Sequence, residues 1–268
     1  MQTSTLLELG PATWILLAVL TVVSAVLWRW GFGRPGRDMI IAAVRALVQL
    51  AVVALLIALL SQHVGLSWIL ILVMFLLATW TAGRRITPQG RWWFAGVAIA
   101  VGVVPVGGVM LLTGVLPWNP LALIALFGQQ IGGAMAATTV AARRIEQELS
   151  VRRGEVEAAA ALGFTWPQAR ILIARPVASE AVIPTLDQTR TAGLVVLPGA
   201  FVGLILGGAS PLAAGAVQLV VLVSLLLVAT LASGVCLILS SRGAWHPPAS
   251  DQRRTSFGRR QSAHPAEG

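Results

Sequence analysis

Three long stretches of the chain carry no charged residue, at positions 46–83, 92–142 and 191–241. A helix needs roughly 20 apolar residues to cross about 30 Å of hydrocarbon, so each stretch is too long for a single crossing. The whole chain is 57% hydrophobic and only 11% charged, whereas a typical soluble domain is about 25% charged. A soluble globule and a disordered chain are therefore excluded, and a disulfide scaffold is excluded because Cys236 is the only cysteine.

Turn residues divide these stretches and predict an all-α, polytopic membrane protein with seven transmembrane helices. The breaks lie near 61–65, 113–120 and 207–211, where Gly, Pro and Ser do not easily continue a helix. The expected spans are 11–30, 39–60, 66–82, 92–113, 120–142, 182–206 and 212–240. They form one permease domain, 1–241, and the segment 242–268 is predicted to be a disordered cytosolic tail because it has few apolar residues to bury.

All 19 basic residues are arginines, and their positions orient the predicted spans. Positive loops stay on the cytoplasmic side, so the N-terminus is predicted outside and the C-terminus inside. A net charge of +9 on the inner face of a membrane needs no nucleic-acid partner. The segment before the first span has Glu8 but no basic residue, so it lacks the charged region of a signal peptide and is expected to be the mature N-terminus. Apart from Arg45 and Arg190 within spans, the arginines lie at the end of or after the first (Arg29, Arg34, Arg37), third (Arg84, Arg85, Arg91), fifth (Arg143, Arg144, Arg152, Arg153, Arg170, Arg175) and seventh spans (Arg242, Arg253, Arg254, Arg259, Arg260).

The connection over 143–181 is the only long one, and loops of this size are usually functional. Helix-favouring Ala, Glu and Arg predict a helix from about 146 to 162, which Gly163 would end. Thr165 and Gln168 have the spacing of a capping box for a second helix, with Pro167 in its first turn and Pro176 at its end. The residues alone leave two readings open: a pair of helices lying on lipid headgroups, or a docking element for a cytosolic protein.

The order of residues in this connection resembles the coupling loop of ABC-transporter permeases. The shared pattern is Glu-Ala-Ala, three residues, Gly, nine residues, Ile, two residues and Pro, with Arg175 in place of the usual Leu. The resemblance implies a helix-turn-helix that seats in a cleft of a soluble ATPase subunit. Small residues would permit close approach and glycine would allow the sharp turn. The ATPase-coupling residues that this implies are Glu157, Ala158, Ala159, Gly163, Thr165, Pro167, Ile173 and Pro176.

The wider segment 152–218 resembles the small metal-export ABC permeases of the Fet (YbbM) type, whose plant relatives are linked to aluminium tolerance. Its sequence includes IPT at 183–185, LPG at 197–199 and SPL at 210–212. The resemblance implies a bacterial inner-membrane half-transporter, in which one permease chain pairs with itself and with two ATPase subunits. The chain departs from the family at two places within the spans: Ala136 and neighbouring glycines replace family amides, and Asp187 and Arg190 replace Asn and Met.

The chain contains no lysine, and this indicates whether it could hydrolyse ATP itself to drive transport. A phosphate-binding P-loop requires a lysine, so this chain holds no Walker motif and is not expected to be an enzyme. The chain is expected to bind no cofactor of its own, with ATP and magnesium held by the partner subunit.

Few polar groups within the spans are candidates for a substrate path. Asp187 and Arg190 lie three residues apart on one helical face and could serve either as a structural ion pair or as substrate contacts. A metal site is not assigned, because no cluster of His, Cys and carboxylate residues has ligand spacing. Gly199, Gly203 and Gly207 recur every four residues and predict a face for close packing with another helix or protomer. The other path candidates are Gln129, Gln130 and Met135.

The predicted function is thus the permease subunit of an ATP-driven ABC transporter, exporting a metal ion or a small solute as a homodimer. Two other classes remain open. An ATPase-independent secondary transporter would need coupling carboxylates and inverted repeats, of which only Asp187 is apparent. A membrane scaffold would use the 143–181 connection to dock a cytosolic partner.

Overall fold

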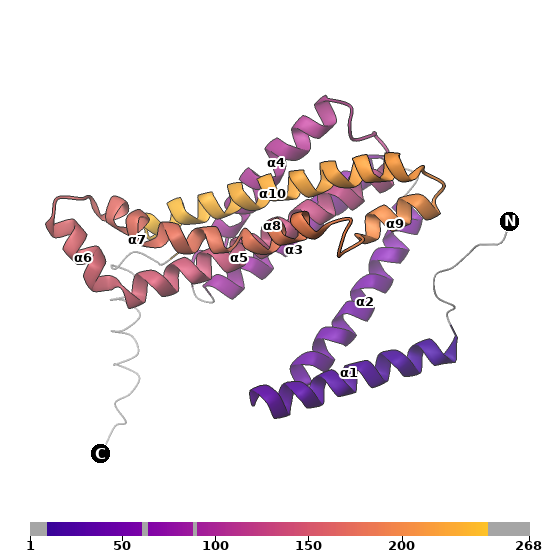
Figure 1. The fold of residues 1–268 in the computed structure, drawn as a ribbon, viewed down its shortest axis with the longest axis horizontal. Coiled ribbons are helices and arrows are strands. Elements are labelled where there is room, and N and C mark those ends of the chain that lie inside the picture. Colours follow the sequence, from indigo (N-terminus) through magenta and orange to yellow (C-terminus); the bar gives the residue numbers. More distant parts are fainter. Residues whose placement is uncertain (1–9, 61–63, 88–89, 246–268) are drawn as a thin grey trace, which may run out of the picture. The chain divides into compact units, whose positions relative to one another are not determined.

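The computed structural model describes residues 10–60, 64–87 and 90–245. Within these ranges the chain forms ten α-helices and no β-strand, apart from an isolated bridge between Ala192 and Val196 (Figure 1). The all-α prediction is therefore confirmed. The helices fall into two units that divide after Gln62, and each unit is described separately.

The first unit is a pair of helices, α1 (Pro11–Phe32) and α2 (Arg37–Leu60). Gly33 ends α1 with φ +64, and its N–H donates to the Arg29 carbonyl at 3.1 Å, which forms a left-handed glycine cap. A Cβ at Gly36 would lie 2.7 Å from the Ala25 carbonyl oxygen, so glycine permits the turn before α2 to approach α1 closely. Most of the large apolar side chains of this pair are exposed, as expected for helices that face lipid.

The second unit is built around two long helices, α5 (Pro120–Val151) and α10 (Pro211–Ser241), which lie along each other (Figure 1). Helix α3 (Val64–Ile86) packs on α4 and α5, and α4 (Phe94–Leu112) packs on α5 and α10. Helices in lipid associate mainly through close van der Waals packing, which favours small side chains at their contacts. The fully buried alanines of these helices are Ala82, Ala95, Ala98, Ala134, Ala141, Ala142, Ala214 and Ala232.

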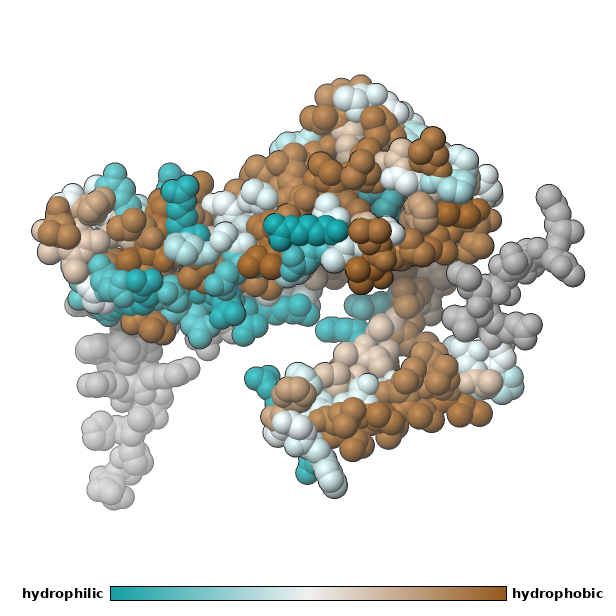
Figure 2. Space-filling model, viewed as in Figure 1, coloured by the Kyte–Doolittle hydropathy of each residue, from teal (hydrophilic) through white to brown (hydrophobic). Residues whose placement is uncertain are grey.

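Six helices in the described part of the chain are long and apolar enough to cross a membrane: α1, α2, α3, α4, α5 and α10. They coincide with six of the seven predicted spans. Hydrophobic side chains cover much of the visible surface, whereas hydrophilic side chains gather around α6 (Arg153–Ala161) and the adjoining end of α5 (Figure 2). This distribution is expected of a polytopic membrane protein with one polar end.

The prediction of one continuous helix over 182–206 is wrong. The structure has two short helices there, α8 (Ile183–Thr191) and α9 (Gly199–Leu206), joined by a connection over 192–198. Gly193 adopts φ +86, and Pro198 has no N–H for a helical hydrogen bond and favours an extended residue before it. The connection is ordered by its own hydrogen bonds, among them Gly193 N–H to the Val196 carbonyl at 2.9 Å.

Two helix boundaries in the 143–181 connection also differ from prediction. Helix α5 does not end at 142 but continues to Val151. The predicted single helix over 146–162 is therefore wrong, because the chain breaks at Arg152 and α6 begins after it. Arg152 bonds Glu148 in α5 and Glu155 in α6, so its side chain bridges the break. Pro176 does not end α7 (Trp166–Glu180), because a single lost hydrogen bond is offset by packing of that helix on α5 and α10.

The predicted tail begins at 242, but the packed structure extends to Trp245. The Trp245 side chain is fully buried, and its Nε1 donates to Ser240 Oγ at 2.8 Å. Its carbonyl accepts from Arg91 N–H at 3.3 Å. The end of α10 is thereby attached to the connection between α3 and α4, while 246–268 lies outside the described residues.

Two glycines of α4 differ sharply in their surroundings and provide a matched test of the packing. A Cβ at Gly102 would lie 2.9 Å from the Val228 carbonyl oxygen of α10, whereas a Cβ at Gly108 meets nothing within 4 Å. We expect Gly102→Leu to destabilise the protein by about 1–3 kcal/mol because α4 and α10 must separate. Gly108→Leu should have little effect. Thermal unfolding of both purified variants in detergent measures the difference, and equal melting temperatures would contradict the close approach.

Candidate functional site

The helix-turn-helix of α6 and α7 has a small core of its own. Val156 and Ala159 of α6 are buried against Ala169 and Ile173 of α7, with Leu149 of α5 packed beside them. This core explains two residues of the permease pattern, because Ala159 and Ile173 face inward and hold the two helices together. Their role in the structure is to fix the angle of the hairpin.

The turn between the two helices requires glycine. Gly163 has φ +98, a region that L-residues with a side chain rarely adopt. Its N–H donates to the Ala160 carbonyl at 3.0 Å, and Phe164 N–H donates to the Ala159 carbonyl at 3.3 Å, so the turn closes α6 tightly. The predicted helix, glycine turn and second helix are therefore present.

The predicted capping residues at the start of α7 are also in place. Gln168 Oε1 accepts from the Thr165 N–H at 3.0 Å and from the Thr165 hydroxyl at 2.8 Å. Pro167 lies in the first turn of α7, where its missing N–H leaves no helical bond unmade. The entry into α7 is thus fixed immediately after the glycine turn.

Ion pairs run along the exposed face of α6. Arg153 Nε lies 2.8 Å from Glu157 Oε1, one helical turn away. Arg152 hydrogen-bonds Glu155, which lowers the pKa of the Glu155 carboxyl, and the bonds to Glu155 and Glu148 raise the pKa of the Arg152 guanidinium. Opposite charges therefore alternate along this exposed face.

The tip of the hairpin exposes large apolar side chains that the sequence analysis did not single out. Leu162 is 81% exposed, and Phe164 and Trp166 are also exposed on either side of the turn. Exposed apolar groups rimmed by charge are typical of surfaces that contact another protein or a membrane. The signal was available in the sequence, since bulky apolar residues directly flank Gly163. Around them the predicted coupling residues Glu157, Ala158, Gly163, Thr165, Pro167 and Pro176 are exposed.

Helix α7 is attached directly to the long helices of the second unit. Ser233 Oγ of α10 donates to the Ala178 carbonyl at 2.6 Å, and Arg170 Nη1 donates to the Ser240 carbonyl at 3.3 Å. Ala174 and Ala178 are buried against the core. A displacement of α7 would therefore move α10, because the helices are joined near both ends of α7.

The predicted substrate-path residues lie in four different environments. Asp187 and Arg190 of α8 pair with each other at 3.6 Å and are both exposed. Gln130 of α5 is fully buried and donates to Met110 Sδ at 3.4 Å, whereas its neighbour Gln129 is exposed and lines an apolar cavity of about 620 Å³. Met135 is half-buried at the edge of the core.

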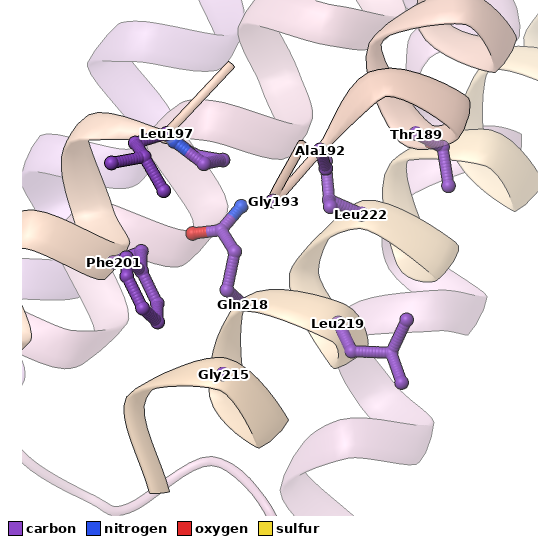
Figure 3. A pocket seen from close by; sticks show the side chains of 10 residues that line it. Thr189, Ala192, Gly193, Leu197, Phe201, Gly215, Gln218, Leu219 and Leu222 are labelled. Carbon is purple, nitrogen blue, oxygen red and sulfur yellow. The ribbon is translucent and has the colours of Figure 1, made fainter. Parts of the chain in front are cut away.

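A second cavity, of about 190 Å³, lies where the α8–α9 connection faces α10 (Figure 3). Gln218 of α10 extends its amide towards Gly193 and Leu197 of the connection. The side chain is 5% exposed, and neither its Nε2 nor its Oε1 has a hydrogen-bond partner in the described part of the chain. The sequence analysis missed Gln218, although it is the one amide in the apolar run 211–241.

Comparison with known proteins identifies the family of this chain. Residues 11–245 match the family described as "Uncharacterised protein family (UPF0014)". The chain belongs to this family. No solved structure matches the chain significantly.

Relatives of the chain agree with the resemblance inferred from the sequence. A rice (Oryza sativa subsp. japonica) protein named "UPF0014 membrane protein STAR2" is 34% identical over 85% of this chain and 79% of its own length. "Protein ALUMINUM SENSITIVE 3" of Arabidopsis thaliana is 32% identical over 73% of each chain. The "Probable iron export permease protein FetB" of Escherichia coli is 29% identical over 77% of this chain and 81% of its own length. The predicted resemblance to the Fet type is confirmed, and the chain is a member of a membrane permease family.

Two sequence predictions remain to be compared with the structure: the packing face formed by the glycines of α9, and the lack of a metal site. A Cβ at Gly199 or Gly203 would meet nothing within 4 Å, so this face of α9 is uncovered by the described part of the chain. Among the described residues, no group of three His, Cys, Asp or Glu side chains is placed to hold a metal ion. The glycine face remains a predicted contact for another helix or protomer.

Proposed function

We propose that this UPF0014 protein is the transmembrane permease subunit of an ATP-driven exporter in a bacterial cytoplasmic membrane. Two copies would form the permease, each docked through α6 and α7 to a separate ATPase subunit that holds ATP and magnesium. The observation that carries the proposal is the hairpin: a rigid pair of helices with an exposed apolar tip, bonded through α7 to α10. The sequence contains no lysine for a P-loop, so hydrolysis must take place on another chain.

The length of α5 supports a cytosolic position for the hairpin. Its 32 residues extend about 48 Å at 1.5 Å per residue, against a hydrocarbon thickness of about 30 Å. The last turns of α5, together with α6 and α7, would project beyond the bilayer on the side where the arginine-rich connections lie. In this topology α8, the 192–198 connection and α9 make the seventh, discontinuous crossing.

The proposed mechanism follows from the attachment of α7. Closure of the ATPase subunits would shift the hairpin, and α7 would pass that shift to α10 through Ala178 and Ser240. Inward-open and outward-open arrangements of the two permease chains would then be biased by nucleotide state. The substrate class is a metal ion or a small solute, in line with the name of the E. coli relative as an iron export permease.

Reversing the charge of Glu157 tests the docking role. The Arg153–Glu157 pair is largely exposed, so its loss should change stability little. We expect Glu157→Arg to weaken co-purification of a P-loop ATPase by about tenfold or more, because a charge at a docking surface becomes repulsive. The matched control is the swapped variant Arg153→Glu/Glu157→Arg, which keeps the i,i+4 pair.

The outcome of the swap decides between docking and local structure. If Glu157 contacts the ATPase, the swapped variant stays defective. If the pair only supports α6, the swap restores binding and the docking role is refuted. Transport that continues in vesicles without any ATPase would replace this proposal with a secondary transporter, and a bound partner that hydrolyses no ATP would favour a scaffold.

A further inference from the structure

The cavity between the α8–α9 connection and α10 has the properties of a binding site. Its volume of about 190 Å³ is several times the roughly 30 Å³ that one water occupies in the liquid. Thr189 and Gly193 lie on its α8 side, Leu197 and Phe201 on its α9 side, and Gln218 on its α10 side. Three chain segments therefore converge on one small space.

Gln218 is the side chain in this cavity that requires a partner. Its amide is 95% buried, is directed into the cavity, and lacks a hydrogen bond at both its nitrogen and its oxygen among the described residues (Figure 3). Burying a polar group without a partner is costly, so such a group is retained where something else satisfies it. The neighbouring Thr189 donates its hydroxyl proton to the Thr185 carbonyl at 2.8 Å, which leaves its oxygen free to accept.

The broken helix beside Gln218 independently points to a ligand. Non-helical backbone within a membrane is tolerated only where protein covers it or where it lines a polar cavity. The 192–198 connection faces the cavity through Ala192, Gly193 and Leu197. Discontinuous crossings of this kind commonly form substrate sites in transporters. Because the N–H groups of Gly193 and Val196 are already hydrogen-bonded, the Gln218 amide is the group left to bind a solute.

The charge of the lining selects the class of ligand. None of the described residues that line the cavity is charged, and nearby on α8 Asp187 and Arg190 pair with each other at 3.6 Å. A bare cation or anion would lose its hydration here without gaining a counter-charge, which is unfavourable. Leu197, Phe201 and Leu222 supply apolar walls, and the amide supplies one donor group and one acceptor.

We propose that this cavity binds a small uncharged polar molecule that carries an adjacent hydrogen-bond donor and acceptor, and that Gln218 recognises it. The inference rests on the proposed permease function and names its substrate site. It excludes a bare metal cation as the species bound at this point. The ligand lies between α10, which α7 contacts, and the connection between α8 and α9.

A thiol-labelling experiment on the full-length permease in nanodiscs tests the class of ligand. Cys236, the only cysteine, is replaced by serine, and Thr189→Cys then places one thiol in the cavity. Ser150→Cys, exposed at the end of α5, corrects for the intrinsic rates of the reagents. Relative to that control, neutral methyl methanethiosulfonate should label Thr189→Cys at least about tenfold faster than cationic or anionic methanethiosulfonates, a difference equivalent to about 1.4 kcal/mol.

Protection of the same thiol tests recognition by Gln218. Acetamide, a neutral probe with an adjacent donor and acceptor, should slow labelling in a concentration series, and Gln218→Leu should abolish the protection. The Gln218→Leu variant should also melt at a higher temperature than its parent, because the unpartnered amide is gone. A rise in melting temperature together with lost protection separates recognition from misfolding.

The remaining outcomes each overturn the proposal. Charged reagents that label the thiol as fast as the neutral one, or protection by MnCl2 alone, would show that the cavity accepts ions. No protection by acetamide, or equal protection in Gln218→Leu, would show that the cavity holds only water. These measurements need neither ATP nor an ATPase, so their failure is distinguishable from failure of the ATPase-coupling proposal.

Discussion

Replacing Gly163 with valine is expected to abolish stimulation of the proposed partner ATPase while leaving the membrane helices folded. The backbone at Gly163 has φ +98, and an ordinary L-residue in a left-handed conformation costs about 1–2 kcal/mol. A β-branched side chain is a more severe case. The turn would relax to a negative φ, which changes the angle between α6 and α7 and displaces Leu162 and Phe164 from the tip.

The control for this variant is a second glycine in the same hairpin. Gly154 lies in the first turn of α6, has no positive φ, and a Cβ there meets nothing within 4 Å. Gly154→Val should therefore retain coupling. ATP hydrolysis by reconstituted complexes, with and without each permease variant, measures the effect. Full stimulation by Gly163→Val would show that the glycine turn does not shape the docking surface.

Trp245→Ala is expected to lower the free energy of unfolding by about 3–5 kcal/mol, the range for removing a large buried aromatic side chain. Trp245 is fully buried and stacks edge-on against Phe94, with ring centroids 6.4 Å apart. The loss would also free Ser240 Oγ, which now accepts from the indole N–H. The attachment of α10 to the α3–α4 connection would weaken.

Trp118→Ala provides the comparison, because Trp118 is 63% exposed and should contribute little to packing. Thermal unfolding of both variants in the same detergent measures the two effects. If Trp245→Ala and the parent protein have the same melting temperature, Trp245 is not part of the folded core. Trp245 also lies next to the contact of Arg170 with Ser240, so loss of stability should be accompanied by weaker coupling.

The hairpin and the long helices could be predicted because their signals are local in the sequence. Uncharged apolar runs specify helices that cross lipid, and Gly163 with the Thr165–Gln168 cap specifies a turn and a helix start. The break at Arg152 was less predictable, since helix-favouring residues surround it and the bridging of Glu148 and Glu155 appears only when both helices are in place.

The seventh predicted span shows where hydropathy alone misleads. Hydropathy predicts one crossing over 182–206, and Pro198 enters the sequence analysis only as part of the LPG segment at 197–199. In the structure Gly193 follows the end of α8, and Pro198 precedes the start of α9. Most of the predicted path residues carry a charge or an amide, but Asp187 and Arg190 pair with each other, and the Gln130 amide nitrogen already donates to Met110 Sδ.

The sequence by itself determined the class of the molecule: a helical membrane protein with arginine on alternate connections, one long hairpin loop, and no lysine with which to form a P-loop. These properties depend on composition, spacing and local turn chemistry. Only the tertiary structure decided that Gln218 faces a cavity without a partner, that Trp245 belongs to the core, and that α7 is bonded to α10. Each of these depends on contacts between segments far apart in the chain, and no local pattern encodes which side chains those contacts leave unsatisfied.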